Sequence, residues 1–288
     1  MKHLKFVFIF LLSIFTLVSC SDENSDDGGS QVLNPLESYE ELNIAYGNDN
    51  DQVFDLYLPA NRSTATKTII LVHGGGWTSG DKIDMNPYKT FLKDQMPNYA
   101  VVNMNYRLAD DNNQAYPMQI NDITSIVNFI KINQNNYTIS DDIGFVGVSA
   151  GAHLSLLWSY AFDTENQTKM VCSVVGPTNF TDPAYLDNLN NPFFQEIVET
   201  FGVNPSTEYL EEVSPYHNVT AEAPPTILFY GGVDPLIPTT QGTDMRDKLE
   251  ALNVVNEFTL YPLEGHGWVG LSLFDTSIKL KAFIETHL

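Results

Sequence analysis

The sequence has few cysteines and few basic residues. Only two of its 288 residues are cysteines, Cys20 and Cys172, so no disulfide framework is expected to stabilise the fold. Cys172 lies in an apolar run, and we expect it to be buried in a core rather than reactive. The chain has 14 lysines and arginines against 36 aspartates and glutamates, a net charge of −22. Such a solvated acidic surface would repel phosphate backbones, which argues against nucleic-acid binding.

Long hydrophobic runs are also scarce, and the main one lies at the N-terminus. Phe6 to Val18 contains only apolar and hydroxyl residues and follows a basic start with Lys2 and Lys5. The run is short for a membrane-spanning helix and is typical of a secretory signal peptide, which we place at residues 1–19. It ends in Leu17-Val-Ser-Cys20, which resembles the lipobox of bacterial lipoproteins. A plain signal peptide followed by an incidental cysteine is the alternative.

The lipobox resemblance implies that Cys20 carries lipid and holds an exported protein to a membrane without a spanning helix. The next segment, Ser21 to Gln31, is acidic, glycine-rich and without apolar residues. It cannot build a core, so we predict a flexible tether over residues 20–38. An acidic run at this place also resembles the surface-export signal of Bacteroidetes lipoproteins. We therefore expect the protein at the outer membrane or on the cell surface of a Gram-negative bacterium.

Residues 39–288 are expected to form one domain in which strands alternate with helices. Val53–Leu58 alternates apolar and polar residues like an early antiparallel strand, whereas Thr68–Val72 is a continuous apolar run typical of a strand buried on both faces. Further strands are predicted at 100–105, 143–147, 170–175, 226–230 and 257–261, and helices at 120–132, 150–162, 243–252 and 276–287. This alternation predicts an α/β fold with a mostly parallel, doubly wound sheet.

The longest irregular stretch runs from residue 179 to residue 224, between two predicted core strands. It contains Phe193, Phe194 and Phe201. One interpretation is a loosely packed surface excursion, and the other is a small cap over an active site. Both interpretations stay open at this point.

The clearest motif is Gly147-Val-Ser149-Ala-Gly151, which matches the pattern G-x-S-x-G. In the nucleophile elbow of α/β hydrolases, the serine sits on a strained turn between a strand and a helix, where its hydroxyl is exposed at the sheet edge. The required strand and helix are predicted directly before and after this motif. Ser149 is therefore the candidate nucleophile.

A glycine-rich turn, His73-Gly-Gly-Gly-Trp77, follows the strand predicted at residues 68–72. Three glycines let backbone N–H groups turn toward a substrate oxygen, so Gly75, Gly76 and Ala150 are the candidate oxyanion-hole donors. The turn lacks the spacing of a phosphate-binding loop. We assign His73 a structural role in holding the turn, because it precedes the nucleophile in the chain.

An acid and a base are expected after the nucleophile, each just beyond a strand. Asp234 and His266 fit these two positions and complete the order Ser149, Asp234, His266. Such a triad would act through an acyl-enzyme and would need neither a metal ion nor a cofactor. The other candidates are weaker: His153, expected beneath the nucleophile helix; His217, His287, Glu264 and Asp244.

Together these residues resemble the hormone-sensitive-lipase-like and feruloyl-esterase-like carboxylesterases of the α/β-hydrolase superfamily. The segments 54–59 and 73–82 are most similar to the bacterial feruloyl-esterase-like (BD-FAE-like) branch. Asn105-Tyr-Arg-Leu-Ala109 is shared more widely, and in the lipase-like branch it usually continues with Pro-Glu rather than Asp110-Asp111. We expect Arg107 to tie loops together through a salt bridge. The short tether also leaves little room for the N-terminal cap of the lipase-like branch.

The resemblance implies an α/β-hydrolase fold with a small insertion near the active site and hydrolysis of short-chain esters, including acetyl esters on plant polysaccharides. Two other interpretations stay open. A prolyl-oligopeptidase-type peptidase shares the elbow and the triad order, although such enzymes normally carry an N-terminal propeller. A non-catalytic surface binding protein on a hydrolase scaffold is the other, although such proteins usually lose a triad residue.

Overall fold

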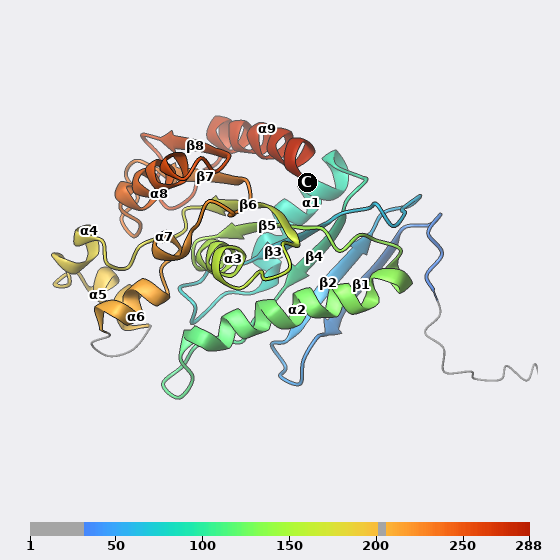
Figure 1. The fold of residues 1–288 in the computed structure, drawn as a ribbon, viewed down its shortest axis with the longest axis horizontal. Helices are drawn as coiled ribbons and strands as arrows, with labels where there is room; N and C mark the ends of the chain where they lie inside the picture. The colour runs from blue at the N-terminus through green and yellow to red at the C-terminus, as the bar shows by residue number, and fades with distance from the viewer. Residues whose placement is uncertain (1–31, 201–205) are drawn as a thin grey trace, which may run out of the picture. The chain divides into compact units, whose positions relative to one another are not determined.

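An eight-stranded sheet runs through the part of the chain that the computed structural model describes, residues 32–200 and 206–288 (Figure 1). The strands lie in the order β1-β2-β4-β3-β5-β6-β7-β8. Their bounds are β1 (Tyr39–Ala45), β2 (Val53–Leu58), β3 (Thr68–Val72), β4 (Ala100–Met104), β5 (Ile143–Val148), β6 (Thr168–Val174), β7 (Thr226–Gly231) and β8 (Asn256–Tyr261). β2 is antiparallel to both of its neighbours, β1 and β4, and every pairing from β4 to β8 is parallel. The predicted antiparallel start and mostly parallel sheet are therefore confirmed.

The two faces of this sheet carry separate apolar cores. In β3, Ile70 and Val72 join one core, whereas Ile69 and Leu71 join the other, and all four are fully buried. Successive side chains of a strand point to opposite faces, so a strand that is covered on both faces needs a continuous apolar run. This is why the run at residues 68–72 identifies a central strand.

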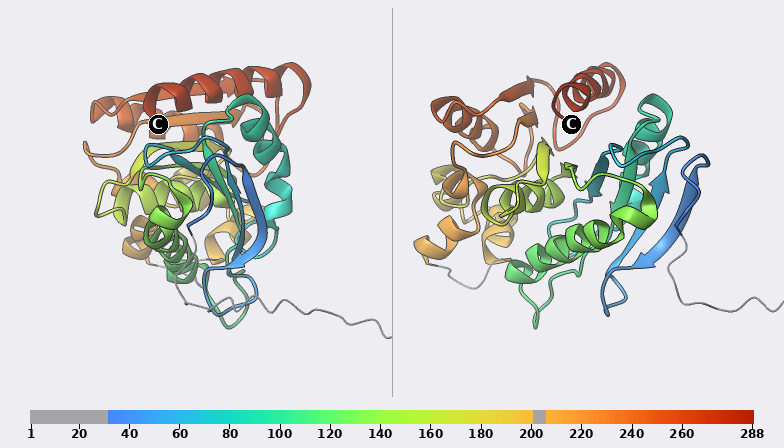
Figure 2. Two further views of the ribbon diagram at one scale, coloured as in Figure 1. Left: turned by 90° about the vertical axis from the view of Figure 1, so that its right-hand side faces the viewer. Right: turned by 45° about the vertical axis from the view of Figure 1, so that its right-hand side comes forward.

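Helices cover both faces of the sheet (Figure 2). On one face, α1 (Asn86–Gln95) and α9 (Gly270–His287) pack Leu92 and Phe283 into the core that contains Ile69. The opposite face is covered by α2 (Ala115–Tyr137), α3 (Ala150–Ala161) and α8 (Thr239–Ala251). The observed layers are those of the doubly wound α/β arrangement predicted from the sequence.

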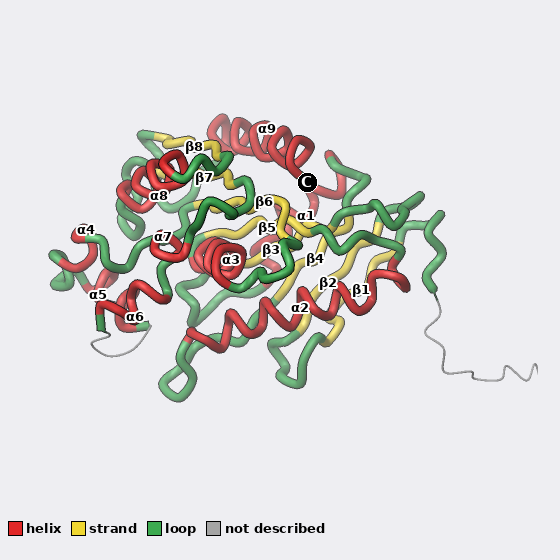
Figure 3. The backbone as a smooth tube through the Cα atoms, in the orientation of Figure 1, coloured by secondary structure: helices red, strands yellow, loops and turns green. Residues whose placement is uncertain are grey.

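Residues 179–224 differ from the irregular stretch that the sequence predicted. The described part of this stretch, 179–200 and 206–224, contains four short helices, α4 (Pro183–Leu186), α5 (Pro192–Glu199), α6 (Thr207–Glu212) and α7 (Pro215–Asn218) (Figure 3). α4, α6 and α7 have at most 6 residues, which is too short to show a helical apolar period. Phe180 and Tyr185 are fully buried, and Phe194 packs edge-on against Tyr185, so the stretch is not a loose excursion. Residue 201 and the side chain of residue 193 lie outside what the structure describes.

The domain starts before the predicted boundary at residue 39. The compact unit begins at Val32, and the buried Arg62 side chain donates to the backbone carbonyls of Leu33 at 3.2 Å and Glu37 at 2.6 Å. Residues 32–38 are therefore packed against the domain rather than part of a tether. The predicted signal peptide and Cys20 lie outside the described residues. Within the described part, no helix is both long and apolar enough to cross a membrane.

Candidate active site

Ser149 sits on a tight turn between β5 and α3. Its φ of 53° and ψ of −121° are unusual for a residue that has a β-carbon, and such strain concentrates at functional sites. The turn requires the glycines of the motif. A β-carbon on Gly151 would lie 2.3 Å from the backbone oxygens of Val72 and His73, so only glycine lets α3 approach β3 this closely.

The structure brings Ser149, His266 and Asp234 together from three separate loops. His266 Nε2 lies 2.9 Å from Ser149 Oγ, and His266 Nδ1 lies 2.8 Å from Asp234 Oδ2. A carboxylate can only accept a hydrogen bond, so Nδ1–H donates to Asp234 Oδ2, and the lone pair of Nε2 is directed at the serine hydroxyl. This is the tautomer that a base for Ser149 requires.

The carboxylate of Asp234 is fixed by backbone hydrogen bonds in addition to its contact with His266. The backbone N–H groups of Leu236 and Ile237 donate to Asp234 Oδ1 at 2.8 and 3.1 Å. The Asp234 side chain is 1% exposed, whereas the His266 side chain is 25% exposed. A buried, anchored carboxylate stabilises positive charge on the ring beside it, and the exposed ring edge stays open to the cavity.

The glycine-rich turn lies beside Ser149, and Gly74, Gly75 and Gly76 all line the same cavity as the serine. Gly75 has a φ of 118°, and a β-carbon there would lie 2.0 Å from the backbone oxygen of Ser79. Among the described residues, the backbone N–H groups of Gly75, Gly76 and Ala150 have no protein acceptor. These donors stay available for a substrate oxygen.

His73 holds this turn, as expected from the sequence. Its Nδ1 lies 2.6 Å from the backbone oxygen of Gly74, and its ring stacks on Tyr106 at 4.2 Å between centroids. The Tyr106 hydroxyl donates in turn to the backbone oxygen of His73 at 2.9 Å. Burial lowers the pKa of His73 below its usual value, which favours the neutral ring.

The other predicted candidates are engaged elsewhere. Glu264 accepts from the Ser272 hydroxyl at 2.7 Å, and Asp244 is exposed on α8. His217 meets the Thr181 hydroxyl at 2.8 Å, and the His287 ring packs on Phe283.

Arg107 forms the expected salt bridge, at 2.6 Å to the fully buried Asp122. Cys172 is a buried free cysteine, and burial raises the pKa of its thiol.

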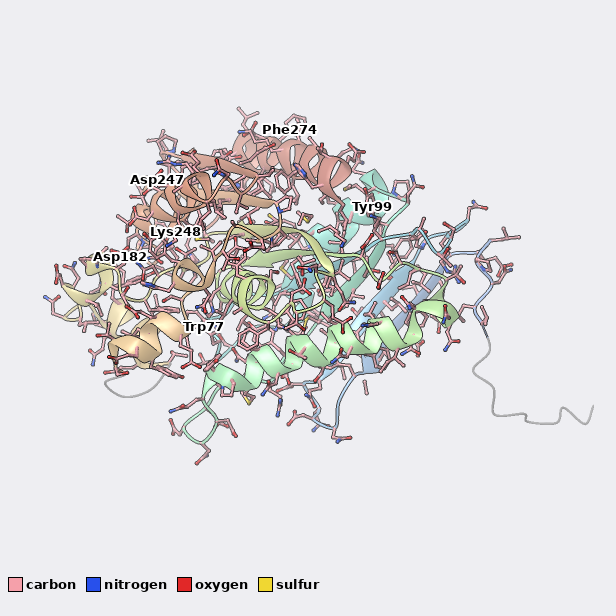
Figure 4. The ribbon with its side chains drawn as sticks, in the orientation of Figure 1. Trp77, Tyr99, Asp182, Asp247, Lys248 and Phe274 are labelled. Atoms are coloured by element: carbon pink, nitrogen blue, oxygen red, sulfur yellow. The ribbon has the colours of Figure 1, made fainter. Side chains whose placement is uncertain are left out.

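His153 and Trp77 form a second polar contact beneath the nucleophile helix. The indole Nε1–H of Trp77, labelled in Figure 4, donates to His153 Nδ1 at 3.1 Å, and His153 Nε2 lies 2.7 Å from the backbone oxygen of Val213. Both side chains are buried, at 0% exposure for His153 and 2% for Trp77. The expected packing of His153 is confirmed. Its two partners lie 76 and 60 residues away in the chain, and no motif in the sequence indicated them.

Ser149 and His266 open into a cavity of about 740 Å³. Its wall is mainly apolar and comes from five parts of the fold: the glycine-rich turn, the segment 84–88, the ends of β5 and β6, the 179–224 insertion, and the loops before α8 and α9. The lining residues are Gly74, Gly75, Gly76, Trp77, Asp84, Met85, Pro87, Tyr88, Val148, Ser149, Val174, Val175, Pro177, Ile197, Thr200, Leu236, Ile237, His266, Gly267, Trp268, Val269 and Leu273. Asp84 is the one carboxylate among them. Neither Asp84 nor the apolar wall was singled out from the sequence.

The described residues include no group of three or more histidine, cysteine, aspartate or glutamate side chains that could hold a metal ion. The polar groups that face the cavity around Ser149 are instead an imidazole and backbone N–H donors. Such a set supplies a nucleophile, a base and an anion-stabilising turn. The geometry therefore fits attack of a serine on a carbonyl carbon.

The chain is similar to known esterases and to a peptidase. The chain is 24% identical to esterase LipC of Mycobacterium tuberculosis over 78% of this chain and 59% of the relative, and 25% identical to dipeptidyl aminopeptidase BIII of Pseudoxanthomonas mexicana over 81% and 34%. It thus spans between a third and three-fifths of these relatives. A solved structure described as a truncated carbohydrate esterase from gut microbiota superposes with a TM-score of 0.70, at 20% identity over 88% of this chain and 99% of that one. This likeness confirms the α/β-hydrolase fold.

A family model identifies the chain more directly, since it covers most of the domain. The matched segment contains the glycine-rich turn, Ser149 and Asp234, and it ends within α8, before His266. Because residues 54–249 match the BD-FAE model, the protein belongs to the BD-FAE family.

Proposed function

We propose that this protein is a serine carboxylesterase in which Ser149, His266 and Asp234 form the catalytic triad. One observation carries the proposal: His266 Nε2 lies 2.9 Å from Ser149 Oγ at the wall of a cavity, while its other ring nitrogen lies 2.8 Å from a buried carboxylate. The base is thus within hydrogen-bond reach of both the nucleophile and the orienting acid. The esterases among its relatives support the same reaction class.

In the proposed mechanism, His266 takes the hydroxyl proton as Ser149 attacks the ester carbonyl carbon. Asp234 stabilises the imidazolium, and the N–H groups of Gly75, Gly76 and Ala150 stabilise the negative oxygen of the tetrahedral intermediate. The imidazolium returns its proton to the leaving alcohol, which gives the acyl-enzyme. Water then attacks the acyl-enzyme with His266 again as base, and Ser149 is regenerated with release of the acid.

The substrates we propose are short-chain esters, acetyl or similar, including those carried on plant polysaccharides. The carbohydrate esterase that superposes on the chain favours this class, and so does the family match. We further propose that lipid on Cys20 anchors the protein at the outer membrane or cell surface, where it would meet such polymers. A panel of p-nitrophenyl esters from acetate to octanoate, together with acetylated xylan, tests the acyl preference.

The decisive test of the triad is Ser149→Ala. We expect hydrolysis of p-nitrophenyl acetate to fall about 10³-fold to 10⁶-fold, and labelling by a fluorophosphonate probe to disappear, because the substitution removes the hydroxyl that lies 2.9 Å from His266 Nε2. Ser277→Ala, on α9 and outside the cavity lining, is the matched control and should keep full activity. Full esterase activity in purified Ser149→Ala protein would overturn the proposal.

A peptidase of the prolyl-oligopeptidase type is the second candidate, favoured by the similarity to dipeptidyl aminopeptidase BIII. Both activities use the same nucleophile, so fluorophosphonate labelling does not separate them. Comparing kcat/KM for p-nitrophenyl acetate with that for dipeptide anilides does. Higher kcat/KM for the anilides would favour the peptidase, and no labelling at all would favour a non-catalytic binding protein.

A further inference from the structure

Trp77 has an unusual backbone for a large residue. It directly follows Gly75 and Gly76, and its φ of 63° lies in the left-handed region, which bulky side chains rarely adopt. Such a conformation persists only where the surroundings hold it in place. Here the backbone oxygen of Trp77 accepts from Gln119 Nε2 at 2.7 Å and from the backbone N–H of Ala109 at 2.9 Å.

The indole of Trp77 is held from the opposite side by His153. The donor is the indole N–H and the acceptor is His153 Nδ1, so the proton of the neutral ring must be on Nε2, which donates to the backbone oxygen of Val213. Trp77 and His153 also meet edge-on, with 5.4 Å between their centroids, and each packs against Phe180. Burial lowers the pKa of His153 to about 4, so the ring is neutral at neutral pH.

His153 therefore joins three segments that are distant in the chain. It belongs to α3, the helix that begins after Ser149. It contacts the glycine-rich turn through Trp77, and it contacts the 179–224 insertion through Val213, between α6 and α7. Phe180, from the other end of the same insertion, packs on both rings.

We propose that His153 is a positioning residue that fixes the oxyanion turn through Trp77 and couples it to the 179–224 insertion. The proposal rests on the esterase function proposed above, because the turn matters only if Gly75 and Gly76 stabilise an oxyanion. Without an acceptor at position 153, the buried indole N–H loses its partner, and the strained Trp77 backbone loses one of its supports. The donors next to it in the chain would then move away from the position of the oxyanion, where small displacements lower the rate strongly.

The test compares two substitutions at one position. His153→Phe keeps a ring but removes both hydrogen bonds, whereas His153→Gln keeps an acceptor and a donor on a neutral side chain. We expect His153→Phe to lower kcat for p-nitrophenyl acetate about 10-fold to 100-fold while KM changes less than about threefold, because transition-state stabilisation is lost rather than substrate binding. His153→Gln should restore kcat to within about threefold of the wild type.

A second buried indole supplies the matched control for stability. Trp158 Nε1–H donates to Thr124 Oγ1 at 2.9 Å, between α3 and α2 and away from the cavity lining. Thr124→Val removes this acceptor just as His153→Phe removes the other. Both variants should lower Tm, but only His153→Phe should lower kcat.

The outcomes separate this inference from the proposed function. Wild-type protein without esterase activity would refute the proposed function itself. With active wild-type enzyme, the inference fails if His153→Phe keeps its kcat, or if Thr124→Val lowers kcat as much. If His153→Phe does not fold, Trp77→Phe tests the same contact by removing the donor instead of the acceptor. A kcat that stays low in His153→Gln would also overturn the proposal.

Discussion

Two histidines lie near the N-terminal turn of α3. One faces the cavity, which we call the open side, and the other is buried, on what we call the closed side. On the open side, His266 lies between a hydroxyl and a buried carboxylate, and its side chain is 25% exposed. On the closed side, His153 lies between an indole N–H and a backbone carbonyl, and it is fully buried. Both rings use both nitrogens, so hydrogen bonding alone does not distinguish a base from a structural histidine.

The difference lies in what surrounds each ring when a proton arrives. Beside His266, the Asp234 carboxylate stabilises the imidazolium, and the ring faces a cavity that a reactant can enter. His153 is enclosed by Trp77 and Phe180, so burial disfavours the charged ring, and the protonated form could no longer accept from the indole. One site is suited to proton transfer and the other to holding a fixed geometry.

The largest expected difference comes from making the same substitution at both histidines. His266→Gln removes the proposed base and should lower kcat for p-nitrophenyl acetate about 10⁴-fold or more, with little change in Tm. His153→Gln keeps one acceptor and one donor and should stay within about threefold of the wild-type kcat. Steady-state kinetics on the two purified variants gives the comparison directly.

His217→Gln is the control for the substitution itself, because His217 is exposed on α7 and outside the cavity lining. It should leave kcat and Tm unchanged. Equal losses of kcat in the His266→Gln and His153→Gln variants would contradict the distinction between a base at position 266 and a positioning residue at position 153.

Much of the open side was predictable from the sequence, because its residues belong to short motifs. The predicted strand at residues 143–147 and helix at 150–162 match β5 and α3, and the loops that carry Asp234 and His266 follow β7 and β8. Central strands show continuous apolar runs, so their bounds could be predicted closely. β1 was missed because it is an edge strand with mostly exposed side chains, and α1 because Leu92 is its one buried residue.

The closed side was not predictable in the same way. His153 was expected to be packed, but its partners come from distant segments, and no local pattern indicates such contacts. Three of the described short helices in the insertion, α4, α6 and α7, have at most 6 residues and are too short to show an apolar period. α4, α5 and α7 begin at a proline, a residue that in a sequence usually indicates a turn or loop. The cavity wall likewise combines residues from five parts of the fold, which only the tertiary structure brings together.

A second prediction concerns stability and pH. The pKa of His153 is about 4 in the folded protein and 6.5 in the unfolded chain, so between these values the unfolded state binds a proton that the folded state does not. Stability contributed by the neutral ring is therefore complete above pH 6.5 and is lost as the pH falls toward 4, by about 3 kcal/mol in total. Urea unfolding at pH 7 and pH 4 measures this loss.

His153→Gln provides the reference, since its side chain does not titrate. Acidification protonates carboxylates in both proteins, and the wild type should lose about 3 kcal/mol more of its unfolding free energy than the variant over this range. If the two proteins lose the same amount of unfolding free energy, burial does not keep the His153 ring neutral. The two histidines would then not differ in how their surroundings affect a charged ring.

The smallest predicted effect concerns Asp84, the carboxylate on the cavity wall. Asp84 is exposed in the 3-10 helix η1 (Lys82–Met85), and its Oδ2 accepts from the backbone N–H of Asp81 at 3.2 Å. A fixed negative charge on the open side should disfavour an anionic acyl group without altering the chemistry at Ser149. Asp84→Asn should therefore raise kcat/KM for mono-p-nitrophenyl succinate by roughly fivefold relative to p-nitrophenyl butyrate, which has the same chain length.

This effect is electrostatic, so it should shrink in 1 M salt, where exposed charges are screened beyond about 3 Å. Asp244→Asn makes the same change of charge on α8, outside the cavity lining, and should leave the ratio of the two substrates unchanged. An equal rise of the ratio in both variants would mean that the acidic surface as a whole, rather than Asp84, discriminates against anions. No change in Asp84→Asn would mean that the reacting ester does not approach this part of the wall, and the open side would then owe its selectivity to the apolar residues around Ser149.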